Sequence, residues 1–176
     1  TTYYRLHQYP AAIRHLNLSL RFDPSYMNAY QNLGLLYKKI RNYSMAENTY
    51  FKGLSINENS DDLYFNLGRL YELQKKLSLA LLCLKKAFSL KATDHIYSYQ
   101  VAQIYIKMAQ WDKALEFLKT TLSLNPEYAP AQYNLGWIYE KHKNSPVLAR
   151  YHYRFFLELE PNSAYRRQIQ RFMNSR

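Results

Sequence analysis

Apolar and small residues recur along the chain at one fixed interval. The stretch QNLGLLY at 31–37 returns, at equal spacing, as FNLGRLY at 65–71, YQVAQIY at 99–105 and YNLGWIY at 133–139. In the first copy Leu, Gly and Tyr are spaced so that they lie on one face of a helix. A period of about 34 residues is typical of repeat architectures, in which each repeat buries its apolar face against its neighbours.

Each repeat predicts two antiparallel helices. The first helix keeps a small residue on its buried face, so that a second helix can approach closely; these residues are Gly34, Gly68, Ala102 and Gly136. The second helix keeps an alanine, at Ala46, Ala80, Ala114 and, one residue late, Ala149. The stretch KHKNSP contains the extra residue, and we expect its Pro146 to be the first residue of the last second helix.

Polar residues in the predicted turns indicate where the second helices begin. Ser44, Ser78 and Asp112 recur with the same period, and we expect each of them to be an N-cap. Ser44 and Glu47 have the spacing of a capping box. Proline cannot continue a helix, and it closes several repeats, at Pro24, Pro126 and, one residue late, Pro161.

These positions resemble the tetratricopeptide repeat (TPR), whose pattern has an aromatic residue, Leu-Gly, Tyr, a later Ala and a terminal Pro. The third copy departs from this pattern, with Val101 and Ala102 in place of Leu-Gly and Ser98 in place of the aromatic residue. The resemblance implies an all-α fold, a right-handed α-solenoid of helix-turn-helix repeats. It also implies that the first helices line a concave groove that binds proteins.

The same spacing predicts how the chain is divided. Four complete repeats are expected, at 27–60, 61–94, 95–128 and, with the one-residue insertion, 129–163. Residues 1–26 match the trailing part of a truncated repeat, which indicates a fragment of a longer array. Residues 164–176 are expected to form an amphipathic capping helix with a polar outer face, as a terminal repeat requires.

The predicted binding surface is the side of each first helix that lies opposite its buried face. An amide recurs there in every repeat, at Asn32, Asn66, Gln100 and Asn134. A carboxamide both donates and accepts, so it can pair with the backbone of a bound peptide whatever the peptide's sequence. The alternative is that these amides only stabilise the helix surface. Other predicted surface residues are Arg69, Gln103, Lys107, Tyr133, Trp137 and Lys141.

Charge and one aromatic residue make this surface more specific. The predicted surface has four cations and one acidic residue, which favours a neutral to acidic ligand; they are Arg69, Lys39, Lys107 and Lys141 against Asp62. Trp137 replaces the Leu, Arg and Gln of the earlier repeats, so packing does not demand an indole there, and Trp is enriched among interface hot spots. The alternative is that the capping helix or a neighbouring side chain covers Trp137. Some TPR co-chaperones bind the acidic C-terminal tails of heat-shock proteins through lysines at set positions of the groove. This chain lacks lysine at those positions, so we do not expect it to bind such tails in the same way.

The remaining residues show no catalytic arrangement. The five histidines lack zinc-like spacing, Cys83 lies at a packing position, and Asp61 and Asp62 lie at a helix start, where acidic residues are favoured. We therefore expect no enzyme activity, cofactor or metal. The apolar stretch 79–84 is far shorter than the ~20 residues that span a membrane.

A formal charge of +11 allows a second hypothesis about function. The C-terminal end is the most basic part, and nucleic acid could bind there through Arg150, Arg154, Arg166, Arg167 and Arg171. A homo-oligomer built through the ends of the array is a third possibility. The reading that the sequence favours is a non-catalytic scaffold, part of a larger assembly, that binds a peptide segment of another protein in the groove.

Overall fold

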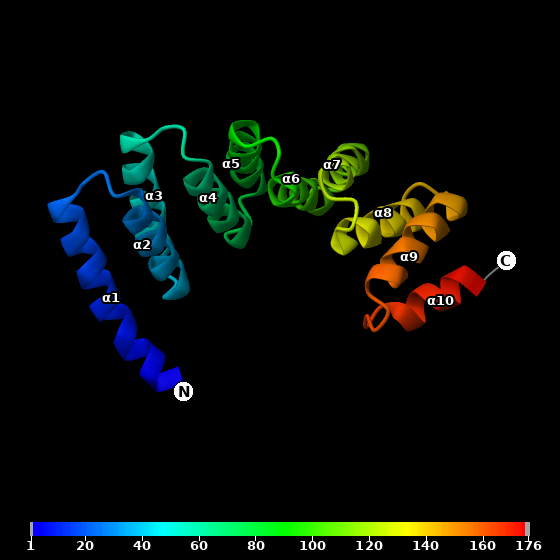
Figure 1. Ribbon diagram of the computed structural model, residues 1–176, viewed down its shortest axis with the longest axis horizontal. Coiled ribbons are helices and arrows are strands. Elements are labelled where there is room, and N and C mark those ends of the chain that lie inside the picture. The colour runs from blue at the N-terminus through cyan, green and yellow to red at the C-terminus, as the bar shows by residue number, and fades with distance from the viewer. Residues whose placement is uncertain (1, 175–176) are drawn as a thin grey trace. The chain divides into compact units, whose positions relative to one another are not determined.

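The computed structural model describes residues 2–174, with side chains from residue 9 onward. These residues form ten helices and no strand (Figure 1). The helices are α1 (Thr2–Phe22), α2 (Met27–Lys39), α3 (Tyr43–Ile56), α4 (Asp61–Leu73), α5 (Leu77–Leu90), α6 (His95–Lys107), α7 (Trp111–Leu124), α8 (Ala129–Lys141), α9 (Pro146–Leu159) and α10 (Arg166–Asn174). The predicted all-α fold is confirmed.

The helix starts follow the period found in the sequence. The first helices α2, α4, α6 and α8 begin at equal intervals, and α3, α5 and α7 do the same. The last second helix, α9, begins one residue late at Pro146, as the insertion predicted. The handedness of the solenoid, the boundaries of the repeats and the capping role of residues 164–176 stay predictions.

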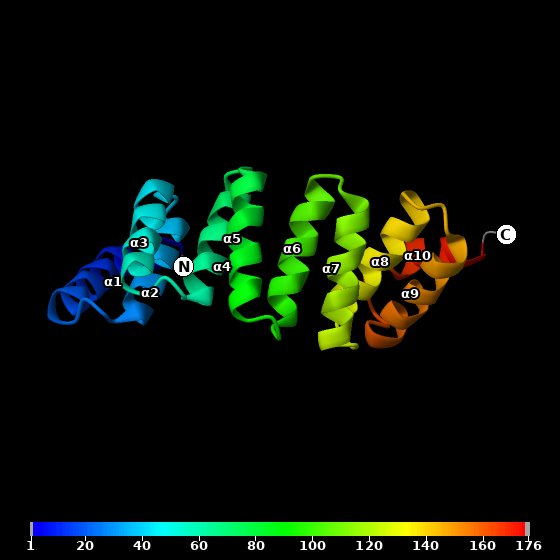
Figure 2. The same ribbon diagram turned by 90° about the horizontal axis from the view of Figure 1, so that it is seen from above.

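The chain divides into two compact units, residues 1–91 and residues 92–176, which we call the N-terminal and C-terminal units. In the N-terminal unit α2 pairs with α3 and α4 with α5, while α1 packs on α2 and α3 on α4. In the C-terminal unit α6 pairs with α7 and α8 with α9, and α10 packs on α9. The paired ribbons of α4 and α5, and of α6 and α7, run side by side in Figure 2. Each helix pair thus buries its apolar face against its neighbours.

The small residues of the first helices allow large side chains of the second helices to lie flat against them. A Cβ atom on Gly34 would lie 2.1 Å from Tyr50 Cε1, and one on Gly136 would lie 2.6 Å from Tyr153 Cδ1. Both tyrosines are at most 1% exposed. Glycine is therefore required at these two positions by the close approach of a ring.

The turns within the helix pairs are tighter than the sequence suggested. Arg41, Lys75 and Ala109 adopt positive φ angles of 61°, 60° and 54°. The amide of the residue after each of them donates to the carbonyl of the recurring tyrosine, as in Lys76 N to Tyr71 O at 2.9 Å. This left-handed residue reverses the chain within a short turn, so α3, α5 and α7 each begin two residues earlier than predicted.

The predicted N-caps Ser44, Ser78 and Asp112 are consequently wrong, because all three lie inside their helices. The N-cap positions are Asn42, Lys76 and Gln110, and of these only Asn42 has a capping side chain, which accepts from Met45 N at 3.2 Å. The predicted capping box is also wrong. Glu47 Oε1 instead accepts from the Tyr71 hydroxyl at 2.7 Å and joins α3 to α4.

Replacing a left-handed turn residue with glycine should stabilise the protein. We expect Lys75→Gly to raise the free energy of unfolding by about 0.5–1 kcal/mol, because only glycine adopts positive φ without a steric penalty. Urea unfolding followed by circular dichroism measures the change. Lys85→Gly, inside α5, is the matched control and should instead lower the free energy by about 1 kcal/mol. A loss of stability in Lys75→Gly would contradict the argument.

Candidate functional site

All ten residues predicted for the binding surface lie on first helices, and none of them is buried. In the N-terminal unit Asn32 lies on α2, and Asn66 and Arg69 lie on α4. In the C-terminal unit α6 carries Gln100, Gln103 and Lys107, and α8 carries Tyr133, Asn134, Trp137 and Lys141. We call these two sets the first-helix surfaces of the units.

In the C-terminal unit, a tyrosine that the sequence analysis did not assign to the site joins two of the predicted amides. Asn134 Nδ2 donates to the Tyr99 hydroxyl at 3.1 Å, and Gln103 Nε2 donates to the same hydroxyl at 2.6 Å. Tyr99 also packs edge-on against Tyr128, with ring centroids 5.0 Å apart. Burial raises the pKa of Tyr99, so the ring stays a neutral phenol. The amides of α6 and α8 are thus held in one cluster.

The N-terminal unit joins its first helices in a different way. Gln31 Nε2 donates to Asp62 Oδ2 at 3.0 Å and links α2 to α4. Phe65 stands one repeat before Tyr99, at the equivalent position, and has no hydroxyl to accept from neighbouring amides. The amide cluster around a tyrosine is therefore found on the first-helix surface of the C-terminal unit and not on that of the N-terminal unit.

Trp137 belongs to a second cluster in the C-terminal unit. It packs edge-on against Trp111, with ring centroids 5.8 Å apart, and against His142, at 4.8 Å. His142 in turn stacks on Trp111 at 3.7 Å. Trp137 is half-buried, so these rings cover part of the indole and leave part of it accessible.

The segment before α10 reaches a different residue of this surface. The ring of Tyr165 stacks on Tyr133 with centroids 4.4 Å apart. Tyr133 also contacts Phe156 of α9 at 5.2 Å. The Tyr133 ring is therefore partly covered by other side chains of the same unit.

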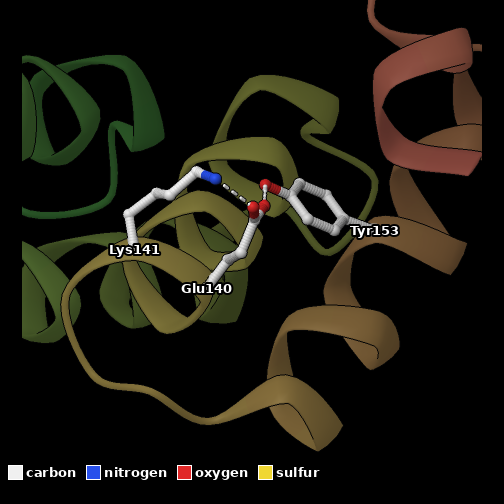
Figure 3. A network of polar contacts seen from close by, with 3 residues as sticks. All are labelled: Glu140, Lys141 and Tyr153. Carbon is white, nitrogen blue, oxygen red and sulfur yellow. Dashed lines mark hydrogen bonds and ion pairs between the residues drawn. The ribbon is translucent and has the colours of Figure 1, made fainter. Parts of the chain in front are cut away.

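Two of the predicted cations have a carboxylate beside them. Arg69 Nε lies 3.2 Å from Glu72 Oε2. Lys141 forms an ion pair with Glu140, whose other oxygen accepts from the Tyr153 hydroxyl at 2.7 Å (Figure 3). These pairs reduce the positive charge that a ligand would meet, which weakens the expected preference for acidic ligands.

Sequence reasoning missed Tyr99, Trp111 and His142. Tyr99 had a usable signal, because it lies one turn before Gln103 on α6 and about one repeat before Asn134. Trp111 is the first residue of α7, where the earlier repeats have Tyr43 and Leu77, so an aromatic residue there looked like ordinary packing.

A histidine is held neutral between α8 and α9 of the C-terminal unit. His152 Nδ1 lies 2.8 Å from Gln132 Oε1, and the ring is parallel to that of Tyr139 at 5.6 Å. Burial, and secondarily the charge of Lys119, lower the pKa of His152 from 6.5 to about 4. Protonation of this ring therefore opposes folding.

We expect His152 to make the protein less stable in mild acid. Its contribution is fully present above pH 6.5 and is lost as the pH falls towards 4, because the unfolded chain takes up the proton first. Since the ring is partly exposed, we expect the loss to be about 1–2 kcal/mol. Urea unfolding at both ends of this range, for the wild type and His152→Gln, measures it. Carboxylate titration is common to both proteins, so identical losses in both would contradict the assignment.

The other chemical candidates have structural explanations. Cys83 is buried in α5, and burial raises the pKa of its thiol to about 11, so it is not an activated nucleophile. Across residues 2–174, no three His, Cys, Asp or Glu side chains are grouped as a metal site would require. No described helix combines the length and the apolar character that crossing a membrane demands.

The predicted basic residues of the C-terminal end differ in their exposure and contacts. Arg150 is half-buried and lies over the Phe172 ring at 5.8 Å. Arg166 Nη1 donates to the Pro161 carbonyl at 2.7 Å. Arg154, Arg167 and Arg171 are exposed.

Sequence profiles described as "Tetratricopeptide repeat" match residues 28–60, 61–94 and 99–128, more than half of the chain. The chain belongs to the tetratricopeptide repeat family. TPR proteins are typically scaffolds for protein–protein interaction. A comparison with curated protein sequences gave no match.

Solved TPR structures share this fold. A crystal structure of MamA is 25% identical, with a TM-score of 0.79, and the alignment covers 89% of this chain and 91% of MamA. YrrB, described as a TPR protein with an unusual peptide-binding site, is 22% identical with a TM-score of 0.77, over 95% of this chain and 86% of YrrB. PilF of Pseudomonas aeruginosa is 21% identical with a TM-score of 0.77, over 89% of this chain and 71% of PilF.

Proposed function

We propose that this TPR protein is a non-catalytic scaffold that binds a peptide segment of a partner protein on the first-helix surface of its C-terminal unit. The observation that carries the proposal is the cluster of Asn134 and Gln103 around the Tyr99 hydroxyl. Both amide nitrogens donate to one hydroxyl, so the amide oxygens remain as acceptors for the N–H groups of an extended peptide. The peptide-binding site of YrrB, a protein of the same fold, is consistent with this role.

The neighbouring aromatic residues define the rest of the ligand. Trp137 lies one turn after Asn134 on α8 and offers a partly accessible indole for an apolar side chain. The pairing of Lys141 with Glu140 leaves the surface close to neutral at that point. The ligand is therefore a neutral to weakly acidic peptide with apolar anchors, and the protein acts as one subunit of a larger assembly.

Affinity capture from the native source, followed by quantitative mass spectrometry, tests this function. The wild type is compared with Gln103→Ala/Asn134→Ala and with a control, Glu116→Ala/Lys119→Ala, whose exposed side chains lie on α7. We expect a protein that the wild type and the control both enrich, and that the amide variant loses.

Two outcomes would contradict the proposal. Retention of every captured protein by the amide variant would exclude the first-helix surface. Capture that disappears after nuclease treatment and weakens steeply with salt would instead support nucleic-acid binding by the C-terminal arginines. Light scattering at two concentrations detects the remaining alternative, a homo-oligomer.

A further inference from the structure

A crevice opens between the second helices α3 and α5 of the N-terminal unit, on the opposite side of α4 from its first-helix surface. Its volume is about 350 Å³, and we call it the α3–α5 crevice. Its walls are Phe51, Leu79, Leu82 and Cys83, while Tyr64 and Tyr71 of α4 form the floor. Leu82 is 67% exposed and Phe51 49%, so large apolar surfaces face the opening.

The preceding repeat contains an equivalent crevice whose walls are partly polar. It lies between α1, α2 and α3 and has a volume of about 230 Å³. Asn17, Asn48 and Thr49 line it at the positions that Phe51, Leu82 and Cys83 hold one repeat later. The repeat therefore packs well with polar side chains at these three positions. The apolar wall of the α3–α5 crevice is not a requirement of the fold.

The charges beside the α3–α5 crevice are mainly positive. Lys86 lines it, and Lys76 Nζ lies 5.6 Å from the centroid of the Tyr71 ring. The only acidic residue of α3 and α5 is Glu47, which accepts the hydrogen bond from Tyr71. Burial keeps the Cys83 thiol protonated by raising its pKa to about 11, so that wall is uncharged. An occupant would meet apolar walls and a rim that is positive at Lys86 and Lys76 and negative only at Glu47.

We propose that the α3–α5 crevice is a second binding site, which takes an acidic amphipathic peptide segment of a partner protein. One Leu- or Phe-sized side chain inserts between Phe51 and Leu82, and a carboxylate of the same segment pairs with Lys86. The volume lies at the low end of that of ligand pockets, about 300–1,000 Å³, which suits one or two side chains. A second copy of this chain is a poor occupant, because the chain carries a formal charge of +11.

A phage-displayed library of short random peptides serves as the probe. It is selected on the immobilised full chain and counter-selected on Phe51→Asn/Leu82→Asn, which installs the residues found one repeat earlier. We expect the enriched peptides to combine an aromatic or aliphatic anchor with an excess of Asp and Glu. Synthetic copies should bind the wild type and lose about tenfold or more in Kd on the double variant, a difference of about 1.4 kcal/mol.

The reactivity of the sole cysteine provides a second measure of binding, and it needs no substitution in the crevice. Cys83 lines the crevice, so a bound peptide should slow its alkylation by N-ethylmaleimide in the wild type. A matched control, Asn17→Ala/Asn48→Ala, alters the preceding crevice and should leave both affinity and protection unchanged. Trp137→Ala, on the C-terminal unit, should also leave them unchanged, which separates this site from the proposed function.

The proposal is overturned if selection enriches no peptide, or if the enriched peptides lack acidic residues or bind the double variant equally well. It is also overturned if the wild type, and not the double variant, forms dimers by light scattering or binds only vesicles of phosphatidylserine and phosphatidylcholine. Those outcomes would assign the crevice to self-association or to a membrane surface. Equal thermal melting of all variants by circular dichroism shows that each is folded.

Discussion

Gly34→Ala should lower the free energy of unfolding by about 2 kcal/mol. The added methyl group would lie 2.1 Å from Tyr50 Cε1, and the Tyr50 ring is fully buried. Overpacking of this kind costs about 1–3 kcal/mol or more, and the better helix propensity of alanine offsets about 1 kcal/mol of it. Urea unfolding followed by circular dichroism measures the net loss.

A second substitution should restore much of this stability. The third repeat has Ala102 and Leu118 where the first has Gly34 and Tyr50, and both are fully buried. Gly34→Ala/Tyr50→Leu therefore reproduces a pair that the chain already packs. It also removes the buried Tyr50 hydroxyl, which has no hydrogen-bond partner among the described residues. If the double variant is no more stable than Gly34→Ala, the steric explanation is wrong.

Trp137→Ala should weaken binding of the partner peptide by about 2 kcal/mol, roughly thirtyfold in Kd, if the first-helix surface of the C-terminal unit is the binding site. The indole is half-buried and lies beside Asn134, which Tyr99 holds in place. Loss of the edge-on contacts with Trp111 and His142 should lower the free energy of unfolding by only about 1 kcal/mol. Isothermal titration with the captured partner's peptide and urea unfolding measure the two effects separately.

Leu148→Ala is the control for this prediction. Leu148 is 42% exposed on α9 of the same unit, outside the first-helix surface, so its removal should leave the affinity unchanged. A Trp137→Ala protein that melts much earlier while its folded fraction binds normally would make Trp137 a packing residue and exclude it from the site.

The sequence predicted the helices well because one strong signal, the regular period of the repeats, recurred along the chain. It predicted their first residues poorly, since the turns depend on Arg41, Lys75 and Ala109 in a left-handed conformation that glycine usually adopts. Because no glycine marks the turn, the sequence favoured Ser44 as the N-cap of α3. The N-cap is Asn42, two residues earlier. The starts of α5 and α7 are set by the packing of the pair, because their N-cap residues Lys76 and Gln110 make no capping hydrogen bond.

The candidate site was predicted only as far as a single helix determines it. Helical periodicity was enough to assign Asn134 and Gln103 to the exposed side of their helices. Both side chains donate to the Tyr99 hydroxyl only because α6 and α8 lie close together. The distance between two helices cannot be read from the residue pattern within either one. The α3–α5 crevice was not predicted from the sequence for the same reason. Its walls come from two helices that are separated in the sequence by α4.

The packing within each unit also has a kinetic consequence. Apart from α2 with α4, the helices in extensive contact are consecutive in the chain. Contacts between segments so close in sequence require only short loops to close, and proteins rich in them fold in microseconds to milliseconds. A nucleus can form at any helix pair and then extend to its neighbours. The α2–α3 pair can therefore begin to fold on the ribosome, before the residues of the C-terminal unit have been translated.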